Sequence, residues 1–148
     1  MKVIISPDSF KGTMSSVEAA ASIEKAIKQI SETIETVCLP VADGGEGTLD
    51  ALVAATNGRF VETTVSNPIG REIRARYGVL GDEKTCVIEM AEASGITLLS
   101  KEERNPMKAT TFGTGQLIDH ALCQGYRHFI IGIGGSATND AGLGMLHA

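Results

Sequence analysis

The chain has 148 residues, of which 43% are hydrophobic and 21% are charged, and this composition excludes disorder as the main state of the chain. Its formal net charge is -5, so the protein offers no positive field that would collect nucleic acid or anionic lipid. We therefore expect neither a nucleic-acid partner nor a membrane partner.

The first half of the chain contains two strand–loop–helix units, a succession that indicates an α/β fold with a parallel sheet. In each unit a short apolar run is followed by a polar loop and then by a helical pattern. Ser15 and Glu18 predict a capping box at the start of the first helix, and Asn57 with Gly58 predicts a C-terminal cap for the second. The predicted strands are 3–5 and 34–39, and the predicted helices are 16–30 and 48–56.

After Arg59 the pattern changes to three extended segments joined by turns. Residues 67–70 and 81–84 have the composition of tight turns, which favours an antiparallel excursion of the chain. The change of pattern also indicates a domain boundary within residues 59–68. The predicted strands are 60–65, 72–80 and 85–90.

The last third of the chain returns to a helix followed by a strand. The charged run 100–106 is expected to be a solvated loop, and Thr114 is expected to cap a helix that continues through Leu122. The strand predicted at 129–133 is apolar along its length, a pattern typical of strands that are covered on both faces. Only the first turns of another helix, near Leu143, follow this strand, so the chain is expected to end inside a larger architecture.

The cysteines and the amino terminus indicate a location in the cell. There are 3 cysteines, all among apolar neighbours, and an odd number favours buried thiols in a reducing compartment. The apolar run at the amino terminus stops at Pro7, which is too short for the core of a signal peptide. No stretch approaches the roughly 20 apolar residues of a membrane helix. These features predict a cytoplasmic protein.

The loop after the first strand, residues 8–13, carries a carboxylate, hydroxyl groups and a lysine. Open α/β sheets bind ligands where strands end and helices start, because a helix start offers free N–H groups to an anion. Lys11 is the counter-charge for a phosphate or a carboxylate, and Ser9 is a secondary donor. The alternative is a surface turn in which Asp8 and Ser9 cap local backbone groups.

The loop after the second strand, residues 43–47, combines glycines with two carboxylates. Gly44 and Gly45 would let a ligand approach the backbone closely. Asp43 and Glu46 could hold Mg²⁺ or accept a proton from a hydroxyl group. Capping of the next helix is the alternative, and it explains one acid more easily than two.

The loop after the last strand begins with Gly132-x-Gly134-x-x-Ala137, a degenerate dinucleotide-binding pattern. The acid expected about 20 residues further on, which would bind a ribose, would lie beyond Ala148. The side chains of this loop suit direct contacts to phosphate oxygens, Mg²⁺ or sugar hydroxyls. A nicotinamide-dependent oxidoreductase is therefore a hypothesis that rests on the glycine pattern alone. The polar residues of the loop are Ser136, Thr138, Asn139 and Asp140.

Two further loops are weaker candidates. Residues 89–95 place a carboxylate at the end of an apolar strand, and residues 110–115 form a hydroxyl-rich loop that enters a helix. Capping of helices explains much of both. The histidines are isolated in sequence, which favours surface positions over a metal site; they are His120, His128 and His147.

Five segments rich in glycine, acids or hydroxyl groups follow one another along the chain. They are ISPDSFKG (5–12), LPVADGGEGT (39–48), EMAEASG (89–95), GTG (113–115) and GIGGSATND (132–140). In this order and spacing they resemble the bacterial glycerate kinase type 1 family, and the resemblance extends over the whole chain.

The resemblance implies an enzyme that phosphorylates D-glycerate to 2-phosphoglycerate with ATP and Mg²⁺ as cofactors. It also implies two α/β domains with the active site in the cleft between them. Residues 1–65 would begin a Rossmann-like domain, and residues 66–148 would begin an inserted second α/β domain. Members of this family are more than twice as long as this chain. The resemblance therefore covers an amino-terminal portion, and the missing carboxy-terminal portion is expected to be needed for a complete fold.

Carried onto this chain, the resemblance suggests roles for individual residues. Phosphoryl transfer requires positioning and charge neutralisation, so Lys11 is expected to contact the transferring phosphate or the glycerate carboxylate. Asp43 is the preferred general base or Mg²⁺ ligand, with Glu46 and Asp8 as alternatives. The residues expected to bind substrate or phosphate are Ser9, Gly44, Gly45, Glu46, Gly134, Gly135, Ser136, Thr138, Asn139 and Asp140. The alternative is that the chain is a catalytically inactive amino-terminal fragment of such a kinase.

Overall fold

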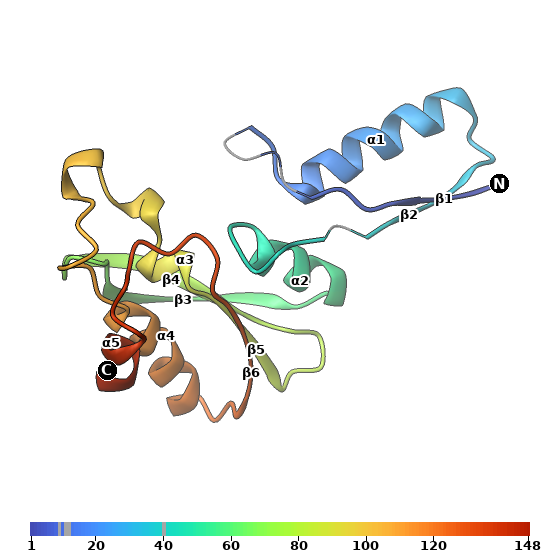
Figure 1. Ribbon diagram of the computed structural model, residues 1–148. Coiled ribbons are helices and arrows are strands. Elements are labelled where there is room, and N and C mark those ends of the chain that lie inside the picture. Colours follow the sequence, from blue (N-terminus) through green and yellow to red (C-terminus); the bar gives the residue numbers. More distant parts are fainter. Residues whose placement is uncertain (9, 11–12, 40) are drawn as a thin grey trace. The chain divides into compact units, whose positions relative to one another are not determined.

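The computed structural model describes residues 1–8, 10, 13–39 and 41–148. The chain divides into two compact units, Met1–Asp43 and Gly44–Ala148 (Figure 1). Both units mix helices with strands that include parallel pairs, which confirms the predicted α/β class.

The first unit is a strand–helix–strand motif made of β1 (Lys2–Ile5), α1 (Ser16–Ile30) and β2 (Glu35–Cys38). β1 and β2 pair in parallel, as predicted. The predicted capping box is present, because the Ser15 Oγ accepts from the Glu18 N–H while a Glu18 carboxylate oxygen accepts from the Ser15 N–H at 2.9 Å.

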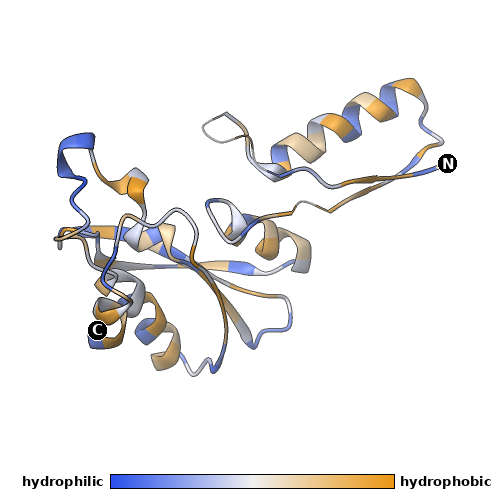
Figure 2. Ribbon diagram, viewed as in Figure 1, coloured by the Kyte–Doolittle hydropathy of each residue, from blue (hydrophilic) through white to orange (hydrophobic). Residues whose placement is uncertain are grey.

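Hydrophobic residues run along both strands of the first unit (Figure 2). Cys38 lies near α1, with its Sγ 3.9 Å from the carbonyl oxygen of Ala20. Ile4 is 63% exposed. Successive residues of a strand point to opposite faces, so the described part of this unit covers its two-stranded sheet by a helix on one face only.

The second unit is built on a four-stranded sheet in the order β3-β4-β5-β6. The first two pairs of neighbours are antiparallel and the last pair, β5 with β6, is parallel. The predicted antiparallel excursion is thereby confirmed, and the sheet ends in a parallel pair. The strands are β3 (Arg59–Ser66), β4 (Glu72–Val79), β5 (Thr85–Glu89) and β6 (His128–Gly132).

Helices cover both faces of this sheet. On one face, α4 (Phe112–Cys123) packs Leu117 into a core that includes Tyr77 and Ile88. On the other face, α2 (Thr48–Thr56) packs Leu49 and Val53 against the sheet. A Cβ at Gly78 of β4 would lie 2.5 Å from the Val53 Cγ2, so this glycine lets α2 approach the sheet.

β6 is an edge strand of the described sheet, with β5 as its sheet neighbour. Most of the strand is hydrophobic (Figure 2). Ile130 is 43% exposed, Ile131 is 39% exposed, and Ile133, just beyond the strand, is 71% exposed. Consecutive residues of a strand lie on opposite faces, so both faces of β6 expose apolar surface.

Two sequence predictions about the last third of the chain were wrong. α4 begins at Phe112, and Thr114 lies inside it, fully buried, with its Oγ1 2.7 Å from the Ser94 Oγ. The threonine hydroxyl has a partner in α3 (Ala91–Ser94) and so does not serve as the helix cap. The charged run is also not an open loop throughout, because it contains the short 3-10 helix η2 (Lys101–Glu103).

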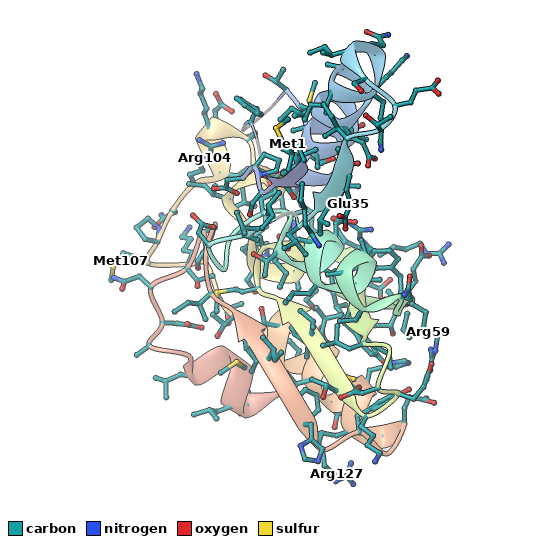
Figure 3. All side chains as sticks on the ribbon, turned by 90° about the vertical axis from the view of Figure 1, so that its right-hand side faces the viewer. Met1, Glu35, Arg59, Arg104, Met107 and Arg127 are labelled. Carbon is teal, nitrogen blue, oxygen red and sulfur yellow. The ribbon has the colours of Figure 1, made fainter. Side chains whose placement is uncertain are left out.

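The segment around η2 connects η1 (Ile96–Leu98) to α4. Ser100 and Glu103 form a capping box that satisfies the start of η2 locally. Arg104 and Met107 project from this segment (Figure 3), and Met107 is 87% exposed. The expectation of solvent exposure for this run is therefore confirmed. A last helix, α5 (Leu143–His147), packs on α4.

The unit boundary after Asp43 lies earlier than the predicted domain boundary after residue 65. It does so because α2 packs against the four-stranded sheet. Assignment of residues 44–65 to one domain or the other in the complete architecture stays a prediction. Within the described ranges, no helix is long and apolar enough to cross a membrane.

Substitution of two leucines on α4 tests which face of this helix belongs to the hydrophobic core. Leu117→Ala is expected to lower the free energy of unfolding by about 2–5 kcal/mol, because it leaves a cavity at a fully buried position. Leu122→Ala on the same helix makes the same chemical change at a side chain that is 37% exposed, and is expected to cost less than about 1 kcal/mol. Urea unfolding of both variants provides the measurement, and equal losses would contradict the assigned core.

Candidate functional site

Four segments of the second unit meet at one edge of its sheet. This loop edge consists of residues 44–47, 89–96, 110–114 and 132–144, and it lies at the carboxyl ends of the parallel strands β5 and β6. The N–H of Met90 donates to the carbonyl oxygen of Gly132 at 2.8 Å, which joins the two strand ends. Four segments selected from sequence as candidate loops are therefore brought together.

Glycines allow two of these segments to touch. The N–H of Gly134 donates to the carbonyl oxygen of Gly44 at 2.7 Å. A Cβ at Gly132 would lie 2.8 Å from that same oxygen, and a Cβ at Gly134 would lie 2.4 Å from the Cα of Gly45. The Gly132-x-Gly134 pattern is thus accounted for by close contact between two loops of the chain. A dinucleotide is not needed to explain it.

The side chain of Glu89, the last residue of β5, binds the start of α2. Its Oε2 accepts a hydrogen bond from the Leu49 N–H at 3.0 Å, and the Gly47 N–H also donates to the carboxylate. The residue is only 3% exposed, and burial raises its pKa, although these backbone hydrogen bonds oppose the shift. The positive end of the helix is therefore already paired with a carboxylate of the chain itself.

Asp140 holds the end of the last loop against the start of α4. Its carboxylate accepts from the Thr111 N–H at 2.8 Å, from the hydroxyls of Thr110 and Thr111, and from the N–H groups of Gly142 and Gly144. Burial raises the pKa of Asp140, but the hydrogen bonds outweigh it and hold the pKa below its usual value. These contacts give Asp140 a structural role, and its predicted role in binding substrate stays a prediction.

The other polar residues of this loop are less enclosed. The Ser136 Oγ lies 2.8 Å from the Thr138 Oγ1 and accepts from the Thr138 N–H at 3.0 Å. Both side chains are half-buried, and Asn139 is exposed. These hydroxyl and amide groups can offer hydrogen bonds to an anion or a sugar at the surface of the loop edge.

Asp8 and Asp43 lie in the first unit. They follow the carboxyl ends of β1 and β2, whose continuations stay together because the Val41 N–H donates to the carbonyl oxygen of Pro7 at 3.2 Å. Both carboxylates belong to exposed residues. Lys11 and Ser9, the other candidates of this unit, lie outside the described residues.

The proposed metal ligands Asp43 and Glu46 are exposed acids three positions apart in the chain. In the described part of the chain, no group of three or more His, Cys, Asp or Glu side chains is arranged to hold a metal ion. Mg²⁺ is commonly held by one or two carboxylates together with substrate phosphates. The assignment of these two ligands stays a prediction.

Sequence reasoning missed an arginine that bridges two elements of the second unit. Arg76 donates to Asp50 of α2 at 2.9 Å and to Glu92 of α3 at 3.0 Å, and its guanidinium lies 4.6 Å from the centre of the Phe60 ring. It lines a hollow of about 320 Å³ on the sheet. No local motif marks such a network, because each partner lies 16 or more positions from Arg76 in the sequence.

Sequence and structure comparisons with known proteins all point to one family. The chain matches the sequence profile of the Glycerate kinase family over residues 3–148. It is 54% identical to the glycerate kinase of Bacillus subtilis and 49% identical to the glycerate 2-kinase of Escherichia coli, in each case over 100% of this chain. A crystal structure from Salmonella typhimurium LT2, titled as a glycerate kinase 2, matches with a TM-score of 0.88 and 49% identity.

The proteins that match are longer than this chain. This chain spans 39% of the length of the two curated relatives and 40% of the chain in the crystal structure, while all of it is matched. The expected amino-terminal position of the match agrees with this coverage.

Asp140→Asn tests the structural role of this carboxylate. At neutral pH the substitution is expected to lower the free energy of unfolding by about 1–3 kcal/mol, because an amide replaces an ionised acceptor of several hydrogen bonds. Since the folded-state pKa is lowered, the stabilisation is present above the ordinary value of 3.8 and is lost as the pH falls through the lower folded-state value.

Urea unfolding of both proteins across this pH range is the measurement. The difference between them should shrink as the pH falls below 3.8. Asp119→Asn removes the same charge at an exposed position of α4, the helix whose start Asp140 binds, and serves as the control. An equal loss of stability in the control variant would contradict the special role of Asp140.

Proposed function

We propose that this chain, which belongs to the glycerate kinase family, supplies the amino-terminal part of an enzyme that transfers a phosphoryl group from ATP to D-glycerate and forms 2-phosphoglycerate. The observation that carries the proposal is the family match over residues 3–148, which includes every glycine- and acid-rich segment of the loop edge. A cytoplasmic location is part of the same proposal.

The loop edge supports this chemistry in a general way. Phosphoryl transfer depends mainly on positioning the reactants and neutralising charge, and both require donors and acids on rigid supports. Ser136, Thr138 and Asn139 present donors on a loop that Asp140 fixes to α4. Ligands of open α/β sheets bind at this kind of edge, beyond the carboxyl ends of parallel strands.

Five acids of the candidate loops divide into two groups by their surroundings. Glu89 and Asp140 accept hydrogen bonds from the backbone and hold loops in place. Asp8, Asp43 and Glu46 belong to exposed residues that can meet a substrate. We assign the reaction to the second group, with Asp43 as the general base that accepts the proton of the attacking hydroxyl and with Asp8 and Glu46 as alternatives.

The remaining roles follow from charge. Lys11 would contact the transferring phosphate or the carboxylate of glycerate, since both are anions. Asp43 and Glu46 would hold Mg²⁺, which supplies charge neutralisation to the nucleotide phosphates when bound. The backbone of Gly44 and Gly45 would then lie beside the reacting groups.

A second candidate follows from the coverage of the relatives. The chain spans 39% of their length, so by itself it could be a non-catalytic fragment that needs the remaining portion. The exposed apolar faces of β6 agree with this candidate.

Two proteins separate the candidates in a coupled assay for ADP release with D-glycerate and Mg-ATP. One is the 148-residue chain, and the other joins it to the carboxy-terminal remainder of the Bacillus subtilis enzyme, with which it shares 54% identity. The fused protein is expected to release ADP in a D-glycerate-dependent manner, and its failure to do so would contradict the proposed function. Turnover by the chain alone, well above the blank without glycerate, would contradict the fragment candidate.

The fused protein also tests the residue roles. Lys11→Ala and Asp43→Ala are each expected to lower kcat/KM by about 100-fold or more, because each removes a group that acts on the reacting atoms. Lys25→Ala and Glu32→Ala change exposed residues of the same unit and are expected to leave kcat/KM within about 2-fold. An unchanged kcat/KM for either site variant would make that assignment wrong.

A further inference from the structure

Glu89 is a buried acid that the proposed reaction does not use. It ends β5, and backbone N–H groups donate to its carboxylate. The charged groups that act on it are the acids Glu92 and Asp50, both of which are bound to Arg76. Burying a carboxylate beside other acids is unfavourable, so the arrangement needs a compensating interaction.

The start of α2 supplies that compensation. The Gly47 and Leu49 N–H groups donate to the Glu89 carboxylate, and the partial positive charge of a helix start favours an anion there. Thr48 lies between these two donors and bonds to the carbonyl oxygen of Gly45, through its N–H at 3.1 Å and its Oγ1 at 2.7 Å. Fixing the start of α2 therefore fixes the loop that precedes it.

The contacts form a closed ring. From Gly45 the chain leads to Gly44, whose carbonyl oxygen accepts from the Gly134 N–H at 2.7 Å. Two residues before Gly134, Gly132 is the parallel register partner of Glu89. The ring thus begins and ends at Glu89 and includes both glycine loops of the loop edge.

We infer that Glu89 is a positioning residue, which holds residues 44–47 against the loop that follows β6 and so sets the place of Glu46. This inference rests on the proposed function, because it assigns that acid to phosphoryl transfer. The inference goes further, because the Glu89 carboxylate already binds the N–H groups of Gly47 and Leu49 at the start of α2. A substrate phosphate is therefore bound by groups other than these two N–H groups.

Hydrogen–deuterium exchange tests the positioning in the 148-residue chain. Glu89→Ala is expected to speed amide exchange by about 10-fold or more at Thr48, Leu49 and Gly134, while Leu117 in α4 keeps its protection. Glu92→Gln removes a neighbouring carboxylate that is bound to Arg76, and should leave exchange at these amides unchanged. Unchanged exchange at Gly134 in Glu89→Ala, or an equal increase in α4, would overturn the inference.

Glu89→Gln extends the test to a conservative change. One amide oxygen replaces two carboxylate oxygens, so the same three amides should show a smaller increase in exchange. If Glu89→Ala does not fold, this variant decides the question by the same criteria.

Kinetics of the fused protein provide the second arm. Glu89→Ala is expected to lower kcat by about 10-fold or more and to leave both KM values within about 3-fold, because the displaced loop carries reacting groups. Glu89→Gln should recover most of kcat, and Glu92→Gln should match the unaltered protein. A rise in KM with unchanged kcat would overturn the inference. If the unaltered fused protein is inactive, the proposed function fails, and the exchange data alone judge the positioning.

Discussion

The candidate site depends on the direct contact between the backbones of two glycine-containing loops. Gly44 and Gly45 lie so close to Gly132 and Gly134 that a single Cβ would come within 2.8 Å of backbone atoms. A side chain at Gly132 or Gly134 would force the loops apart, and protein interiors do not accommodate such displacements without a cost in stability. The hydrogen bond between Gly134 and Gly44, the capped start of α2 and the ordered strand ends all require this approach.

Around this contact the chain uses acids for two different purposes. Glu89 and Asp140 bind backbone N–H groups and give the loops one arrangement. Loops that lack regular hydrogen bonds need such internal acceptors, because buried N–H groups left unpaired are costly. Glu46 is exposed on the loop that these contacts hold. The glycine- and acid-rich segments of the second unit therefore contain both buried acids that hold loops and an exposed acid.

Local patterns predicted most of the fold. The capping box at Ser15, the parallel pairing of β1 with β2 and the antiparallel excursion follow from local patterns, and each was expected from sequence. Thr114 was misassigned because its hydroxyl bonds to Ser94, 20 positions earlier. Glu89 bonds to Leu49 over 40 positions, and Asp140 bonds to Thr111 over 29, so no local motif could assign their partners. The four loops could be chosen from sequence, but their contacts depend on tertiary packing.

The exposed edge of β6 has a consequence for how the chain behaves among other polypeptides. An unpaired strand edge carries a row of main-chain donors and acceptors, which any extended segment can extend into a further strand. Because Ile130 and Ile131 expose apolar surface, such pairing would also remove hydrocarbon from water. At high concentration, copies of this chain would therefore compete with one another for this edge. Solubility would then fall as the concentration of the chain rises.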